Sequence, residues 1–435
     1  MNDETGAGTP ADQTQRKRTV LVRNRDFLML WSGESVSSLG SQIGVIVLPS
    51  LAVLYFGQGA LGVGFLVALQ WIPFMLLAPI VGVLTDRFRR KVLMQIANIA
   101  RFVILFSLPV AVLTDQLTMT HLYVAALLKG VFDVVFQLSY QAFLPFLLDR
   151  DDLTDGNAKT QLSRSLALIM GRSVGGGLVS ALGPVRAMAV NGLGYLVSSL
   201  ALLFVRKPES VPEPPEGGLR TVLVELKGGV VLTFGNRLLR YLTLMATFGN
   251  MAVSLTLAMI IVFAYEDLGF NGAQVGLALG LGSAAVVIGA LSSQWINERL
   301  GMGRTLIFTH LVLALAFALL PVALFGGTGF AFAVIIVSQC LSSFTTPIAN
   351  VGIMTIIQKT TPPEAMGRVG GVALPFVWGS NAVGPLLGSA LAVAFANWVA
   401  FVLAAVMALI AAVWVLVGAL YRVVDEVPEE SRIVL

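Results

Sequence analysis

Apolar stretches long enough to cross a lipid bilayer recur along almost the whole chain. A membrane-spanning helix needs about 20 mostly apolar residues, and short polar breaks divide this 435-residue sequence into twelve such runs. The sequence therefore predicts an all-α integral membrane protein with twelve transmembrane helices. We expect the spans at residues 27–55, 62–84, 92–114, 121–147, 162–183, 187–205, 240–264, 274–296, 305–325, 330–356, 368–393 and 399–420.

Composition excludes several other classes of protein. Hydrophobic residues make up 56% of the chain and charged residues only 12%, whereas about 25% of the residues in an ordinary soluble domain are charged. This balance excludes a soluble enzyme, a disordered chain and a nucleic-acid-binding protein. The single cysteine, Cys340, excludes an internal disulfide. Since the chain has only two histidines, we expect no metal site and no cofactor.

Basic residues predict the orientation of the chain in the membrane. With the N-terminus placed inside, 24 of the 28 Lys and Arg residues fall in segments on the inner side. Only Arg186 falls in an outer loop, and three lie within spans. Because Lys and Arg are enriched in cytoplasmic loops, we expect both termini in the cytoplasm and the protein in a bacterial-type inner membrane.

The longest polar break divides the spans into two groups of six. It opens with RKPESVPEPPEGG, which is typical of a linker because it is rich in Pro, Glu and Gly. Leu and Val then alternate with charged residues, as in a helix that lies on the inner membrane surface. The predicted organisation is a disordered cytoplasmic tail at 1–20, a six-helix bundle at 21–205, a cytoplasmic linker with a surface helix at 206–239, a second six-helix bundle at 240–421 and a cytoplasmic tail at 422–435.

The two groups of six spans carry similar motifs at corresponding positions. GVLTDRFRRK (82–91) follows the second span, and NERLGMGR (297–304) follows the eighth. The fifth span carries GRSVGGG (171–177), and the eleventh carries GSNAVGPLLG (379–388). We therefore expect two pseudo-symmetric six-helix bundles around a central cavity, which is the plan of one large class of transporters.

These motifs together resemble the major facilitator superfamily. GVLTDRFRRK is similar to the family signature G-x-x-x-D-R-x-x-R-[RK] between helices 2 and 3. Three further segments resemble the efflux branch, which includes macrolide and siderophore exporters of the drug:proton antiporter type: FLMLWSGESVSSLGSQI (27–43), FLPFLLDRDDLTDGNA (143–158) and NGAQVGLALGLGSAAVVIGAL (271–291). Glu34 departs from the branch, where Gln is common at this position.

The resemblance implies a conformational latch in the loop at 82–91. Asp86 would join the two halves when the cavity opens outward, together with the basic residues Arg87, Arg90 and Lys91. An acid in this position can pair with an arginine and also favour the N-terminus of a neighbouring helix. Alternatively, the basic residues only anchor the topology.

Five ionisable residues lie within the predicted spans: Glu34, Arg101, Lys129, Asp133 and Arg172. Placing such a group at the bilayer centre costs roughly 2.5–3.5 kcal/mol. From the rise of about 1.5 Å per helical residue, Glu34 and Arg172 have similar depths, and Arg101 and Asp133 meet near the midplane. Lys129 and Asp133 are four apart and share a helix face. We expect Arg172 beside Glu34, and Arg101 or Lys129 beside Asp133.

The two acids within the spans are candidates for proton coupling. Resemblance to the superfamily implies that helices 1, 4, 7 and 10 line the cavity, and Glu34 and Asp133 lie on helices 1 and 4. Burial favours the neutral form of a carboxyl, whereas a nearby cation favours its ionised form. An antiporter needs both effects, because its carboxyl must take up a proton in one state and release it in another. Structural ion pairing is the alternative for all five residues.

The C-terminal half offers uncharged candidates for the other wall of the cavity. A cavity with charge on one wall and polar or apolar groups on the other suits an amphipathic or lipophilic molecule. The candidates are Asn250, Ser254, Gln339, Asn350, Trp378 and Asn381.

The sequence thus favours a secondary active exporter of drug-like or natural-product molecules, driven by inward proton flow and able to confer multidrug or antibiotic resistance. The chain contains no G-x-x-x-x-G-K-[ST] motif for ATP. The alternatives are a dedicated siderophore exporter and a lipid flippase of the same fold. A membrane sensor or scaffold is a third class, for which no output domain is visible. We expect a monomer, not an enzyme, with the lipid bilayer, a small-molecule substrate and protons as its partners.

Overall fold

The computed structural model describes residues 20–149, 152–209 and 218–423. Within these residues twelve helical segments are long and apolar enough to cross a membrane, so the expected all-α fold with twelve spans is confirmed. The N-terminal half contains α2 (Val20–Arg23), α3 (Arg25–Leu54), α4 (Ala60–Arg87), α5 (Arg90–Leu113), α6 (Met119–Leu147), α7 (Leu153–Leu182) and α8 (Pro184–Leu203).

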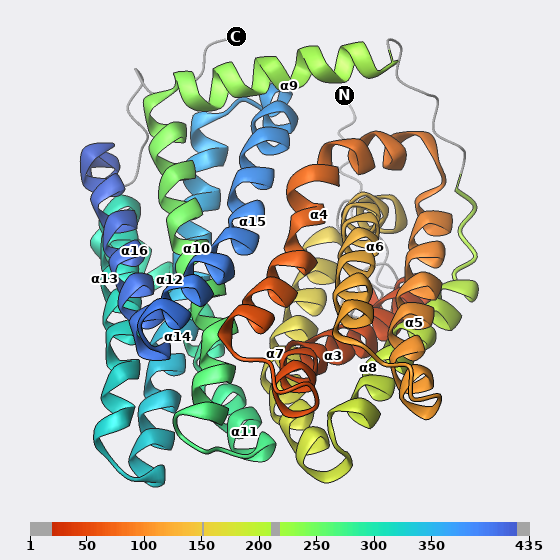
Figure 1. The fold of residues 1–435 in the computed structure, drawn as a ribbon. Helices are drawn as coiled ribbons and strands as arrows, with labels where there is room; N and C mark the ends of the chain where they lie inside the picture. Colours follow the sequence, from red (N-terminus) through yellow and green to blue (C-terminus); the bar gives the residue numbers. More distant parts are fainter. Residues whose placement is uncertain (1–19, 150–151, 210–217, 424–435) are drawn as a thin grey trace, which may run out of the picture.

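The C-terminal half contributes the other six spans, of which two consist of more than one helical element. It contains α10 (Arg237–Glu266), α11 (Gly272–Ser283) with α12 (Ala285–Leu300), α13 (Met302–Leu319) with η2 (Leu320–Phe325), α14 (Thr328–Thr360), α15 (Pro363–Ala394) and α16 (Asn397–Val417), followed by η3 (Leu420–Arg422). The two halves lie beside one another in Figure 1.

Helix α9 (Gly218–Gly235) lies across one end of the bundle, where α10 begins (Figure 1). We call this side the α9 end and the opposite side the far end. Helix α9 packs closely on α15 of the C-terminal half. The approach is so close that a Cβ atom added to Gly229 would collide with the backbone of Arg368. The rings of Phe234 and Phe376 also meet, with their centroids 5.3 Å apart. This helix falls within the amphipathic stretch that the sequence predicts.

The residues after α8 are attached to the N-terminal half. The Asp26 carboxylate accepts hydrogen bonds from the backbone amides of Arg206 and Lys207, at 3.0 and 2.7 Å. The Glu209 carboxylate accepts from the first two backbone amides of α5, both at 3.0 Å. These amides have no partner within their own helix, and a negative charge is favourable at a helix N-terminus. The segment is therefore fixed to α3 and α5.

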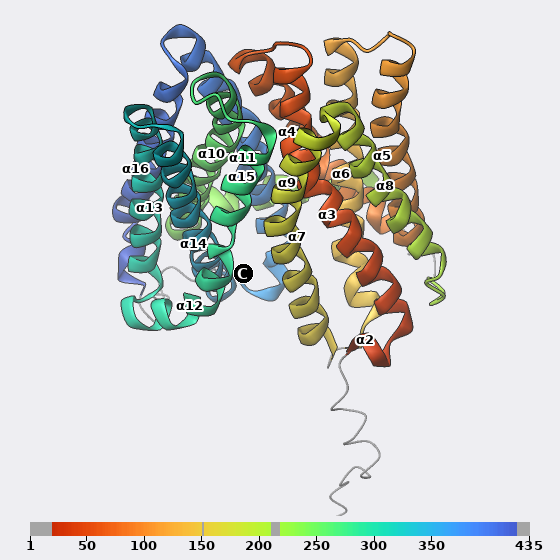
Figure 2. The same cartoon turned by 90° about the horizontal axis from the view of Figure 1, so that it is seen from below.

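Close contacts between the halves lie toward the far end. Helix α7 lies beside α11 (Figure 2), and a Cβ atom on Gly276 would come within 2.6 Å of the Gly176 Cα atom. A Cβ atom on Gly64 of α4 would lie 2.5 Å from the Ser389 Cβ atom of α15. Small residues of this kind let helix backbones approach closely within lipid. In this structure the two halves therefore pack tightly against each other at the far end.

Helix α7 extends beyond its apolar run. The sequence predicts the fifth span at 162–183, whereas the helix begins at Leu153. The additional residues are mostly polar, so they do not belong to an apolar run. Because of this extension, Arg164 lies within a membrane-spanning helix, more than a third of the way along it, rather than at its start.

Candidate functional site

A cavity of about 400 Å³ is lined almost entirely by the N-terminal half. The C-terminal half contributes only Leu257 and Ala258 of α10 to its lining. Most of the lining comes from α3, α4, α6 and α7, with Arg101 from α5. The lining includes the ionisable residues Glu34, Arg101, Lys129, Asp133 and Arg164, the hydroxyl and amide residues Ser37, Ser38, Ser41, Gln42, Gln70 and Gln137, and the aromatic residues Trp71, Phe74 and Phe136.

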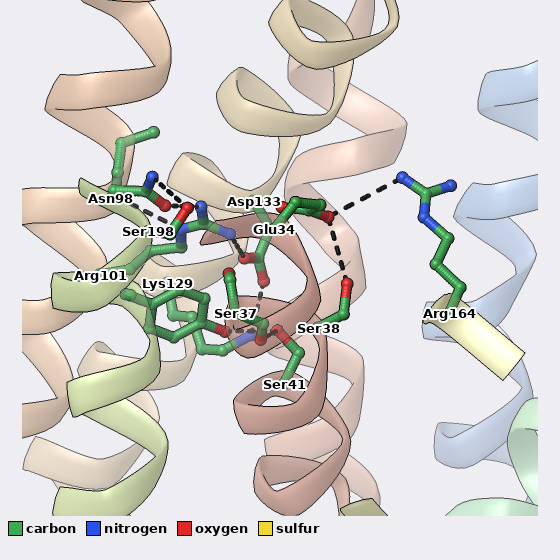
Figure 3. Close-up of polar contacts among 12 residues, drawn as sticks. Glu34, Ser37, Ser38, Ser41, Asn98, Arg101, Lys129, Asp133, Arg164 and Ser198 are labelled. Atoms are coloured by element: carbon green, nitrogen blue, oxygen red, sulfur yellow. Dashed lines mark hydrogen bonds and ion pairs between the residues drawn. The ribbon is translucent and has the colours of Figure 1, made fainter. Parts of the chain in front are cut away.

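Asp133 is the centre of an ion network on one wall of the cavity (Figure 3). Its Oδ1 atom lies 3.1 Å from Arg101 Nη1, and its Oδ2 atom lies 2.6 Å from Lys129 Nζ. The two cationic side chains are only 5% and 10% exposed, whereas Asp133 is 22% exposed. The carboxylate thus has one cation on each oxygen and also reaches the cavity. The structure places both expected cations beside Asp133.

Aromatic rings and an asparagine hold the Arg101 guanidinium in addition to its acidic partner, Asp133. Its guanidinium lies between the rings of Phe136 and Tyr195, 4.2 and 4.3 Å from their centroids. It also donates a hydrogen bond to Asn98 Oδ1, and Asn98 Nδ2 donates to Ser198 Oγ at 3.0 Å (Figure 3). Cation–π contacts are strongest where the groups are desolvated. Three helices, α5, α6 and α8, therefore hold this guanidinium.

The sequence analysis did not identify the residues that support Arg101, although the spacing of Phe136 along α6 indicates its position. Phe136 lies three residues after Asp133 and seven after Lys129, so all three share one face of α6. Tyr195 and Ser198 have no comparable signal, because their position beside α5 depends on how α8 packs.

Glu34 has a different partner from the expected one. The prediction that Arg172 lies beside Glu34 is wrong. The Glu34 Oε1 atom instead lies 3.9 Å from Arg164 Nη2 (Figure 3). The same oxygen accepts a hydrogen bond from Ser38 Oγ at 3.2 Å. The other carboxylate oxygen is buried and has no hydrogen-bond partner among the described residues. The early start of α7 brings Arg164 to the depth of Glu34.

Arg172 instead joins the two halves. Its Nη1 atom donates a hydrogen bond of 2.9 Å to Ser283 Oγ, at the point where the eighth span breaks between α11 and α12. Its Nε atom is buried without a hydrogen-bond partner in the described part of the chain. Among the same residues no carboxylate forms a salt bridge with Arg172. At the interface between the halves, the Arg172 guanidinium therefore has a hydroxyl and no carboxylate as its partner among the described residues.

The six candidates from the C-terminal half do not line the cavity in this structure. They are Asn250, Ser254, Gln339, Asn350, Trp378 and Asn381. Asn250 and Ser254 donate hydrogen bonds to carbonyl oxygens of their own helix, at 2.9 and 3.2 Å, as polar side chains within helices often do. Trp378 packs against Phe74, with ring centroids 5.5 Å apart, and Phe74 rather than Trp378 lines the cavity.

The predicted latch loop is described only in part. Asp86 lies in the last turn of α4, but its side chain is outside the described residues. Arg90 Nη1 donates to the carbonyl oxygen of Ala142 at 3.4 Å, and Lys91 Nζ donates to that of Val205 at 2.6 Å. These carbonyls lie near the ends of α6 and α8, where cations are favourable. In this structure the two basic residues fasten helices within the N-terminal half.

Comparison with known proteins identifies relatives of this architecture. A family model described as Major Facilitator Superfamily matches residues 30–380. The enterobactin exporter EntS of Citrobacter koseri is 25% identical over 324 residues, which cover 71% of each chain. The enterobactin exporter EntS of Escherichia coli O1:K1 / APEC is 25% identical over 321 residues, again 71% of each chain.

Solved structures share the fold at low sequence identity. The nucleoside transporter NupG (D323A mutant) superposes with a TM-score of 0.73 at 14% identity, covering 90% of this chain and 99% of that one. A bacterial homologue of the iron transporter ferroportin, in an inward-facing state, also gives a TM-score of 0.73, at 15% identity, covering 91% and 98%.

Proposed function

We propose that this chain, which belongs to the Major Facilitator Superfamily and is therefore a membrane transporter rather than an enzyme, exports amphipathic small molecules in exchange for protons. Siderophores are the first substrate class to test, because the curated relatives named above are enterobactin exporters. Drug-like molecules are the second class, and the amphipathic cavity lining favours them equally.

The observation that carries the proposal is the ion network on the cavity wall. Ionisable groups within a membrane are costly and mark ion or substrate pathways. Asp133 is held between two nearly buried cations, yet its own side chain is open to the cavity, from which a proton can reach it. Protonation of Asp133 would remove the ion pair with Lys129. Such a change in contacts can bias the balance between two conformations.

The cavity lining supports an amphipathic substrate. Its volume of about 400 Å³ lies within the range of small-molecule sites. Serine and glutamine side chains of the lining offer hydrogen bonds, while Trp71, Phe74 and Leu257 offer apolar surface. Glu34 and Asp133 line the same cavity, so a substrate with both polar and apolar surface would find partners for both.

The distribution of charge supports an inner-membrane orientation with the α9 end in the cytoplasm. Basic residues gather in the segments at that end, as cytoplasmic segments of membrane proteins do. The tight glycine contacts between the halves lie at the far end. We therefore infer that substrate enters from the α9 end and leaves at the far end after the contact between α7 and α11 opens.

The proposal is tested with purified protein in proteoliposomes that carry a proton gradient. Enterobactin and a macrolide are supplied at the face that carries α9, and both substrate movement and proton movement are recorded. We expect Asp133→Asn to abolish proton-driven transport while substrate still binds, and Glu34→Gln to shift the pH optimum or uncouple transport partially. Asp115→Asn is the matched control, because this exposed loop acid lies between α5 and α6, outside the cavity lining.

Two outcomes would contradict the proposal. The first is wild-type protein that moves neither compound when the proton gradient is imposed. The second is a Glu34→Gln, Asp133→Asn double variant that keeps substrate-induced proton movement at the wild-type rate. In that case both acids are structural ion-pair partners.

A further inference from the structure

The cavity contains more cationic than anionic side chains. Arg101, Lys129 and Arg164 line it, together with the two acids Glu34 and Asp133. Arg101 and Lys129 both contact Asp133, which leaves Arg164 and Glu34. With both acids ionised, one positive charge is in excess, and a proton on either acid would increase that excess.

Arg164 is the cation that a ligand can reach most easily. Its side chain is 37% exposed, compared with the nearly buried side chains of Arg101 and Lys129. The 3.9 Å separation from Glu34 is too long for a hydrogen bond, and the Arg164 guanidinium has no hydrogen-bond partner among the described residues. A guanidinium presents several N–H donors in a planar fork that matches a carboxylate. Arg164 therefore has unused capacity to bind an acidic group.

Arg164 also lies where two cavities meet. A second pocket of about 300 Å³ extends from Arg164 along α6 and α7, toward the α9 end. Its lining includes the polar residues Gln141, Asn157, Thr160 and Gln161. Arg164 lines both this pocket and the central cavity. A solute that follows this path from the α9 end meets Arg164 before it reaches Asp133.

Arg172 is a second cation on the same helix, and among the described residues it forms no salt bridge with an acid. It follows Arg164 by eight residues, which is about 12 Å along the helix axis toward the far end. Its described contact is with the Ser283 hydroxyl, across the interface between the halves. Leaving a buried cation without a counter-charge is costly. Opening of the interface between α7 and α11 would expose this guanidinium to the space between the halves.

We propose that the exported molecule carries an acidic group, and that Arg164 and then Arg172 hold this group as the cavity changes its access from the α9 end to the far end. The inference rests on the proposed export function and specifies the charge of the substrate. In the competing interpretation, Arg164 serves only Glu34 and Arg172 only ties the two halves together. The two interpretations differ in whether the arginines distinguish a charged ligand from a neutral one.

Binding to Arg164 is tested with two probes that differ only in charge. The probes are 1-pyrenebutyrate and its methyl ester, and the protein is the full chain in lipid nanodiscs. We expect the wild-type protein to bind the acid at least tenfold more tightly than the ester. Arg164→Gln should remove this preference and leave affinity for the ester unchanged, and Arg164→Lys should retain part of it. Arg186→Gln is the matched control, because Arg186 is an exposed arginine at the far end.

The role of Arg172 is tested by transport of the same two probes in proteoliposomes. We expect Arg172→Gln to bind the acid normally but to move it at least tenfold more slowly, with movement of the ester unchanged. A purely structural role would slow both probes equally.

The outcomes separate this inference from the proposed function. Equal binding of the two probes, binding of neither, or a preference that survives Arg164→Gln overturns the acidic-substrate inference. Equal slowing of both probes by Arg172→Gln overturns the assignment of Arg172. The export proposal itself is judged separately, by proton-dependent movement of enterobactin and the macrolide and by the Glu34→Gln, Asp133→Asn double variant.

Discussion

At the scale of single residues, the two cations beside Asp133 are held very differently. The Arg101 guanidinium is enclosed by two aromatic rings and by Asn98, so its position is set by packing. Lys129 has its described hydrogen bond with Asp133 alone. When Asp133 loses its charge, Arg101 keeps its surroundings, whereas Lys129 loses its partner. Lys129 is therefore the member of the network that can move.

Tyr195 is the residue whose replacement tests this packing. We expect Tyr195→Leu to lower the apparent Tm of the purified protein more than Tyr195→Phe does. Phenylalanine keeps the ring that faces Arg101 and loses only the hydroxyl contact with Ser41, which measures 3.0 Å. The ring is worth about 2 kcal/mol or more where the cation is desolvated, and the hydroxyl about 1 kcal/mol. Thermal unfolding of both variants in one detergent measures the difference, and equal Tm values would show that the ring does not hold Arg101.

At the scale of elements, α7 combines most of the features that relate to transport. It supplies Arg164 to the cavity, Arg172 to the interface and Gly176 to a close backbone contact with α11. Its polar first turns lie beside the second pocket. One helix therefore links access from the α9 end with the contact that closes the far end.

Neighbouring glycines of α7 provide a test of that contact. A Cβ atom on Gly176 would collide with the backbone of Gly272 and Gly276, whereas one on Gly177 would meet nothing within 4 Å. We expect Gly176→Ala to separate α7 from α11 and to shift the population toward a state open at the far end. Gly177→Ala is the matched control on the same helix. Spin-label distances between the far ends of α7 and α11 measure the shift, and identical distance distributions in the two variants would refute it.

At the scale of the whole molecule, the segment between the halves is anchored on both sides. Asp26 of α3 binds the residues that follow α8, Glu209 of that segment binds the start of α5, and α9 packs on α15 through Gly229. Movement of one half relative to the other must therefore be accommodated between these two anchors. Within the N-terminal half, Arg90 and Lys91 are engaged with carbonyl oxygens in this structure.

The latch assigned to Asp86 stays a prediction at this scale. We expect Asp86→Asn to fold and insert normally but to impair transport, because the charge would stabilise one of the two conformations. Coupling between states is typically worth about 1–3 kcal/mol, so the rate should fall roughly 5- to 150-fold. Transport across an imposed proton gradient measures the loss, and Asp115→Asn serves as the control for charge. Wild-type transport by the Asp86 variant would remove the latch from the mechanism.

The sequence by itself determined the number of spans, the division into two bundles of six and the pairing of Lys129 with Asp133. Hydropathy and helical spacing are local properties, and each of these features depends on them alone. Tertiary structure decided that Glu34 faces Arg164 and that Arg172 crosses to Ser283. It also placed the cavity in the N-terminal half. These features depend on the rotation of each helix about its axis and on which helices pack together. The position of an apolar run in the sequence determines neither of these.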